Sequence, residues 1–127
     1  MSKGKSKPPE KWEYDGVNQR FARIYTTMLY KDGFKKLKPR TRMLYVYMKE
    51  RYKGDANKNA PNGDKAQFLF PWHLANKTAE LYTNKSTFYS DIQALIDSGF
   101  IECVENNKNL RKSNVYKFSD KWKEEGK

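Results

Sequence analysis

The chain has 127 residues, carries 26 Lys and Arg against 15 Asp and Glu, and contains one cysteine. This length suits one domain, and a single Cys103 excludes an intrachain disulfide. The first 16 residues lack the apolar stretch of a signal peptide, and the longest apolar run, residues 43–48, is too short to cross a bilayer. We therefore expect a cytoplasmic protein without membrane insertion, whose formal charge of +11 favours a polyanionic partner.

The positive charge is concentrated in three blocks, residues 1–11, 31–53 and 106–127, whereas residues 85–105 carry one lysine against four carboxylates. Low apolar content predicts a flexible basic tail over residues 1–16, a folded domain over 17–122 and a charged tail over 123–127. Gly, Asn, Asp and Pro dominate residues 53–65 and predict a loop.

The first half of the domain contains one ambiguous element and one clear helix. Residues 21–30 fit either a strand or a short helix that ends near Gly33. Pro39 then opens a helix over residues 38–52. Its expected apolar face consists of Met43, Leu44, Tyr47 and Met48, and its opposite side of Arg42, Lys49 and Lys53.

The second half predicts a strand, two helices and a hairpin. Residues 66–70 form a short strand, and Pro71 begins a helix of about nine or ten residues, with Trp72, Leu74 or Ala75, and Ala79 on its inner face. A polar turn follows, in which Asn84 or Thr83 caps a third helix over residues 85–98. That helix has an apolar stripe and ends at Gly99. The stripe consists of Phe88, Ile92, Leu95 and Ile96. Residues 100–105 and 115–118 flank an Asn-rich tip and predict the hairpin.

This order of elements predicts the α+β class and, within it, a winged helix-turn-helix: a three-helix core with a small antiparallel sheet and a β-hairpin wing. In such a fold the second helix of the pair enters the major groove of double-stranded DNA and reads base edges. With the apolar stripe turned inward, the predicted base-reading residues are Ser86, Thr87, Tyr89, Ser90 and Gln93. Asp97 also points outward.

Because these residues are almost all neutral, phosphate groups must be neutralised by other parts of the chain. The predicted phosphate-binding residues are Lys85, Lys108, Arg111, Lys112, Lys35, Lys36, Lys38, Arg40 and Arg42. About six such contacts would give a log–log dependence of affinity on salt with a slope of about −5. The alternative interpretation of both groups is an ordinary solvated surface.

An enzymatic function is not expected. The sequence has no metal-ligand spacing, no phosphate-binding Gly-rich loop and no nucleophile motif, so we predict no catalytic residue, no metal and no cofactor. Cys103 is interpreted as a small core hydrophobe, and His73 as a structural or exposed residue.

Residues 81–105, LYTNKSTFYSDIQALIDSGFIECVE, resemble the turn, recognition helix and first wing strand of winged-helix proteins from plasmids, phages and conjugative elements of Gram-positive bacteria, notably the N-terminal domains of plasmid replication initiators. FARIYTTML, LKPRTRMLYVYMKERY and FLFPWHLA resemble that family's upstream elements, and the final SDKW is similar to endings in related mobile-element proteins.

The resemblance implies sequence-specific binding of duplex DNA at an origin or operator. It places Lys85, Ser86, Thr87, Tyr89, Ser90 and Gln93 on the recognition helix and Lys108, Arg111 and Lys112 in the wing. A full initiator of that family has a further C-terminal domain, whereas this chain ends soon after the wing. The expected role is therefore a transcriptional regulator or an accessory factor at an origin of replication or conjugative transfer, with a protein partner of the replication or transfer complex.

Two other functions remain open. An adaptor could use the same fold to hold a protein partner against the acidic residues 85–105. RNA or single-stranded DNA could bind instead, with exposed aromatics such as Tyr82 or Tyr89 stacking on bases.

Overall fold

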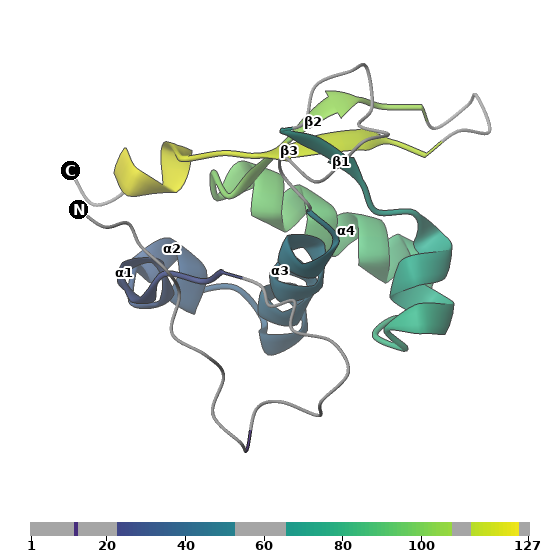
Figure 1. Ribbon diagram of the computed structural model, residues 1–127, viewed down its shortest axis with the longest axis horizontal. Coiled ribbons are helices and arrows are strands. Elements are labelled where there is room, and N and C mark those ends of the chain that lie inside the picture. Colours follow the sequence, from purple (N-terminus) through teal and green to yellow (C-terminus); the bar gives the residue numbers. More distant parts are fainter. Residues whose placement is uncertain (1–11, 13–22, 53–65, 108–112, 125–127) are drawn as a thin grey trace.

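The computed structural model describes Trp12 and residues 23–52, 66–107 and 113–124. Over these residues the chain is of the expected α+β class, with short and long helices and a three-stranded antiparallel sheet (Figure 1). The predicted basic tail apart from Trp12, the predicted loop over 53–65 and residues 125–127 lie outside the described residues. Figure 1 places the labelled helices on one side of the sheet.

The described part of the ambiguous lead-in, residues 23–30, contains one short helix and no strand. Helix α1 (Thr26–Leu29) is followed at once by α2 (Asp32–Lys35), and Gly33, predicted to end the lead-in, lies inside α2. Asp32 in the first turn and Lys35 in the last match the helix dipole. Burial of Met28 and Phe34 fixes the two short helices on the core.

Helix α3 (Pro39–Arg51) confirms the predicted helix within one residue at each end, with Pro39 in its first turn. The predicted apolar face is partly wrong, because Met43 is 43% exposed and the buried residues are Thr41, Leu44, Tyr45 and Met48. The Tyr45 ring makes edge-to-face contacts with Phe34, Phe100 and Phe118. These contacts explain why α3 is rotated about its axis relative to the predicted orientation. The interior aromatics therefore determine which side of α3 is turned inward.

Lys49, predicted on the outer side of α3, is half-buried instead. Its ammonium lies 4.4 Å from the centroid of the Phe118 ring. A long aliphatic stem allows lysine to cover apolar surface in this way. Burial, with a smaller contribution from Arg23, lowers the pKa of Lys49.

The second predicted helix is shorter than expected. After β1 (Gln67–Leu69), residues 72–78 are helical and the last five form the π-helical turn η4 (Leu74–Thr78). The helix stops because Glu80 adopts a left-handed φ of 54°. Ala75 is fully buried, while Trp72, Leu74 and Ala79 are half-buried.

Hydrogen bonds between η4 and residues 81–82 hold the turn that follows η4. The backbone N–H groups of Leu81 and Tyr82 donate to the Ala75 carbonyl, and the Asn76 side-chain amide donates to the Tyr82 carbonyl at 2.8 Å. These bonds set the direction in which the chain enters the next helix, α4.

Helix α4 (Lys85–Asp97) confirms the third predicted helix and its cap. The Asn84 Oδ1 atom accepts from the N–H groups of Ser86 at 2.8 Å and Thr87 at 3.2 Å. Of the predicted stripe, Phe88, Ile92 and Leu95 are buried and Ile96 is half-buried.

The stop after α4 requires glycine. Gly99 has a φ of +83°, and a Cβ atom there would lie 2.8 Å from the backbone nitrogen of Trp122, in the 3-10 helix η5 (Lys121–Glu124). That nitrogen donates to the Gly99 carbonyl at 3.1 Å. The C-terminal end of the domain is thereby attached to the end of α4.

The sheet has strand order β1-β3-β2. Strands β2 (Ile101–Glu105) and β3 (Val115–Phe118) form the predicted hairpin, with Cys103 opposite Tyr116. Strand β1 adds to the other edge of β3, with Phe68 also opposite Tyr116, and this pairing was not predicted. Phe68 stacks on Phe118 at 4.6 Å between ring centroids, so the core lies between the sheet and helices α3 and α4.

Candidate nucleic-acid interface

The outward face of α4, which we define as Ser86, Ser90, Gln93 and Asp97, is exposed as the apolar stripe predicted. Thr87 lies on the flank and is half-buried. Gln93 and Asp97 are joined one turn apart, because the Gln93 Nε2 atom donates to the Asp97 Oδ1 atom at 2.9 Å. The face thus carries two hydroxyls, one amide and one carboxylate.

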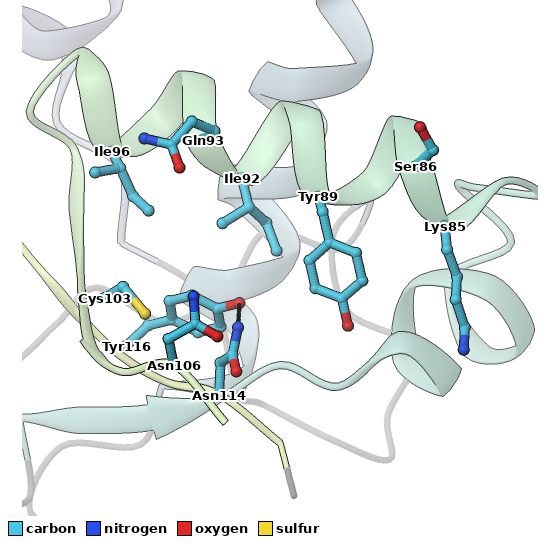
Figure 2. A pocket seen from close by; sticks show the side chains of 10 residues that line it. All are labelled: Lys85, Ser86, Tyr89, Ile92, Gln93, Ile96, Cys103, Asn106, Asn114 and Tyr116. Atoms are coloured by element: carbon cyan, nitrogen blue, oxygen red, sulfur yellow. Dashed lines mark hydrogen bonds between the residues drawn. The ribbon is translucent and has the colours of Figure 1, made fainter. Parts of the chain in front are cut away.

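A groove of about 660 Å³ separates α4 from the hairpin. Figure 2 shows Lys85 and Tyr89 extending from the same side of α4, whereas Ser86 points to the other side of the helix. Ile92 and Ile96 supply apolar surface on the helix side, and Cys103, Asn106, Asn114 and Tyr116 form the hairpin side. Of the predicted reading residues, Ser86, Tyr89 and Gln93 line this groove, which we call the α4–hairpin groove, and Ser86 and Gln93 also belong to the outward face.

Tyr89 belongs to the groove rather than to the outward face. Its side chain is 44% exposed, and its ring lies 4.8 Å from the Phe88 ring, between centroids. It also lines a second hollow of about 360 Å³, together with Trp72 and the exposed His73. Tyr82, the other aromatic predicted to stack on single-stranded bases, is buried at 3% exposure, so that assignment is wrong.

Two asparagines close the root of the hairpin. The backbone N–H of Asn107 donates to Asn114 Oδ1 at 2.6 Å, and the Asn107 side-chain amide donates to the Ser113 carbonyl at 2.9 Å. The Asn114 amide in turn donates to the Tyr116 hydroxyl at 3.2 Å. Asn107 and Asn114, predicted as part of a polar tip, therefore connect the two strands, and the predicted cations Lys108, Arg111 and Lys112 lie outside the described residues.

Arg40 connects α3 to α4. Its Nε atom lies 3.4 Å from the Asp91 Oδ2 atom, and its guanidinium lies 5.1 Å from the centroid of the Tyr82 ring. The Tyr82 hydroxyl donates to the same Asp91 oxygen at 2.5 Å. Burial, followed by the hydrogen bond to Asp91, raises the pKa of Tyr82. The Arg40 side chain is still 42% exposed, so it combines a structural contact with an accessible cation.

Asp91 is the residue of this cluster that the sequence interpretation missed. Its side chain is 4% exposed, although it was counted only as part of an acidic segment. The signal was present in its spacing, since residues 88, 91, 92 and 95 share one helical face. A carboxylate within an apolar stripe indicates a buried polar partner, here Tyr82 together with Arg40.

The other predicted cations differ in how far they reach solvent. Arg42 is half-buried, with Nε donating to the Leu37 carbonyl at 3.0 Å and Nη2 to the Lys35 carbonyl at 2.5 Å. Four lysines of the predicted set are exposed: Lys35, Lys36, Lys38 and Lys85. The accessible positive charge of the predicted set therefore lies at the start of α4, at Arg40 in α3, and on the segment that joins α2 to α3.

Cys103 is half-buried against the core and forms part of the groove wall, so it is less enclosed than a core residue. Burial raises the pKa of its thiol. Among the described residues, no three His, Cys, Asp or Glu side chains gather closely enough to hold a metal ion. No helix in the same part of the chain is long and apolar enough to span a membrane.

No family model, curated protein or solved structure matches this chain.

Proposed function

We propose that this protein is a winged helix-turn-helix protein that binds double-stranded DNA in a sequence-specific manner. Its elements support this fold, because α3, β1, η4, α4 and the β2–β3 hairpin follow one another in the order that such a domain requires. The β2–β3 hairpin follows directly after α4 in the chain, and β1 pairs with the free edge of β3. Helices η4 and α4, joined by a short closed turn, form the helix pair.

The observation that carries the proposal is the outward face of α4. It presents small hydrogen-bonding groups on a helix of thirteen residues, which is the kind of surface that enters a major groove about 12 Å wide. Exposed lysines lie at its start and before α3, where they can neutralise phosphates. Ser86, Ser90 and Gln93 are assigned to base reading.

The α4–hairpin groove is assigned to the DNA backbone. If α4 occupies the major groove and the hairpin lies beside it, one DNA strand passes between them, along the side to which Lys85 and Tyr89 point. Lys85 and the Tyr89 hydroxyl then contact phosphate instead of bases. The sequence resemblance favours a transcriptional regulator or an accessory factor at an origin of replication or conjugative transfer.

Selection of bound duplexes from a random pool tests the proposal. Ser90→Ala and Gln93→Ala should each relax the selected sequence by about 1–3 kcal/mol at one position. Tyr89→Phe should weaken all duplexes alike, because a phosphate contact carries no sequence information. Lys121→Ala is the matched control, since it removes an exposed cation from η5, which is attached to the opposite end of α4.

Salt dependence provides a second measurement. Retardation of the selected duplex should weaken with a log–log slope of about −5 if about six phosphates are neutralised. Lys36→Ala and Lys38→Ala should each reduce the magnitude of that slope by about one. A slope near zero would contradict duplex DNA as the ligand.

A further inference from the structure

Gln93 and Asp97 form a polar pair on the outward face of α4, with the Gln93 amide nitrogen 2.9 Å from the Asp97 carboxylate. An ionised carboxylate only accepts hydrogen bonds, so the Gln93 amide must turn its NH₂ group toward Asp97. This contact determines on which side the Gln93 amide presents its oxygen and on which side its NH₂ group. The amide oxygen, the remaining N–H and the free lone pairs of the carboxylate stay available to a ligand.

Asp97 stands where its charge is unfavourable for both the helix and DNA. It is the last residue of α4, where the helix dipole disfavours a negative charge. It also lies on the same face as the base-reading residues assigned above, in a protein with an excess of cations.

Two other carboxylates close to α4 are compensated by cations. Asp91 contacts Arg40, and Glu102 lies 4.0 Å from both Lys117 and Lys121. Among the described residues Asp97 has no cation within ion-pair distance, and its contact is with Gln93. A carboxylate at this position repels phosphate, and it interacts favourably only with hydrogen-bond donors.

We infer that the Gln93–Asp97 pair selects a base with an exposed amino group, adenine or cytosine, and rejects guanine or thymine at one position of the bound site. Adenine N6 and cytosine N4 are the amino donors in the major groove, whereas guanine O6 and N7 and thymine O4 are acceptors. The pair offers more acceptors than donors, so it matches the first group and repels the second. Gln93 contacts the base, and Asp97 is a positioning residue that orients the Gln93 amide and adds negative potential. This inference rests on the proposed function.

The test is duplex selection from a random pool with the full chain and four variants. The unmodified protein should select adenine or cytosine at one position, and Gln93→Ala should remove that preference. Asp97→Ala should increase relative binding of guanine or thymine there by about tenfold, as expected for loss of a base-discriminating contact. Asp97→Asn can still accept the Gln93 bond but lacks the negative charge. It should therefore increase relative binding of guanine or thymine less than Asp97→Ala does.

Asp120→Ala is the matched control, because it removes an exposed carboxylate outside α4 and should leave the selected sequence unchanged. Selection of guanine or thymine at the Gln93-dependent position would overturn the inference, and so would an Asp97→Ala variant with unaltered preference. Both results would leave sequence-specific DNA binding intact. Failure of the unmodified protein to retain any duplex at low salt would instead overturn the proposed function.

Discussion

Helices α3 and α4 each have thirteen residues, yet they use their polar side chains in opposite ways. Three of the four cations of α3 are engaged by other parts of the fold: Arg40 by Asp91 and Tyr82, Arg42 by two carbonyls, and Lys49 by the Phe118 ring. The outward face of α4 is exposed, and the Asp97 carboxylate is its one charged group. Three of the cations that first indicate a polyanion partner therefore take part in the fold, while the outward face of α4, which has little charge, is available to a ligand.

High pH gives the strongest test of the buried interior against which α3 and α4 pack. Burial raises the pKa of Tyr45, in α3, and of Tyr116, beneath α4, to about 12, whereas an unfolded tyrosine has a pKa of about 10. The unfolded chain loses these protons at lower pH than the folded chain does. The stabilisation from the two tyrosines is therefore fully present below about pH 10 and is lost between about pH 10 and 12. At about 1.4 kcal/mol per pH unit for each group, the loss is on the order of 5 kcal/mol.

Urea unfolding at a series of pH values, with tyrosinate absorbance as a second signal, measures this loss. The lowered pKa of Lys49 acts in the opposite direction, because stability from a lowered pKa increases as the pH rises toward the unfolded value. Lys49→Met should therefore steepen the alkaline decline. Equal unfolding midpoints at pH 8 and pH 11.5 would contradict the burial of these phenols.

Removing Asp91 breaks the connection between the two helices. Asp91→Ala leaves the buried Tyr82 hydroxyl without its acceptor and Arg40 without its carboxylate, and should cost about 2–4 kcal/mol of unfolding free energy. Asp97→Ala is the control on the same helix, with an expected change within about 0.5 kcal/mol because Asp97 is exposed. If urea unfolding shows that Asp91→Ala loses no more unfolding free energy than Asp97→Ala, the Arg40 connection is not important for stability.

Arg42 tests whether a predicted phosphate-binding residue is structural. Arg42→Ala removes two bonds to the carbonyls of Lys35 and Leu37, at the end of α2, and should cost about 1–2 kcal/mol. Arg42→Lys should recover little of this, because an ammonium does not reproduce the planar fork of the guanidinium. Lys36→Ala, an exposed neighbour, should change thermal stability far less. If Lys36→Ala lowers the melting temperature more than Arg42→Ala does, Arg42 belongs to the solvated surface.

The smallest stability effects are expected on the outward face of α4. Ser86→Ala and Ser90→Ala should each change the free energy of unfolding by less than about 0.5 kcal/mol, while altering the DNA sequences that are selected. The adjacent Asn84→Ala should cost about 1 kcal/mol, because Asn84 caps the helix. If the serine variants destabilise the fold as much as Asn84→Ala, these serines have a structural role.

Local signals were sufficient for α3, α4 and the hairpin. Pro39, Asn84 and Gly99 act through their own backbone or side-chain geometry, so the sequence marks these boundaries within a residue or two. The π-helical turn and the early stop at Glu80 have no such marker. Helices of four residues, such as α1 and α2, are too short for hydrophobic periodicity to distinguish them from a strand.

Long-range contacts determined what could not be predicted. Strand β1 pairs with β3 across about fifty residues, and Arg40 is 51 residues from Asp91. The apolar stripe was enough to predict the outward orientation of Ser86, Ser90 and Gln93. It could not predict that Tyr89 points into a groove, because the opposite wall of that groove is the hairpin.

The attachment of Trp122 to Gly99 also has a spectroscopic consequence. The Trp122 ring stacks on Phe100 just beyond the end of α4, and the Trp72 ring packs on Phe88 near its start, with centroids 6.1 and 5.6 Å apart. Trp12, the third indole, is 83% exposed. Variants that keep a single tryptophan at position 72 or 122 would thus report by fluorescence on each end of α4 separately, including while a ligand binds.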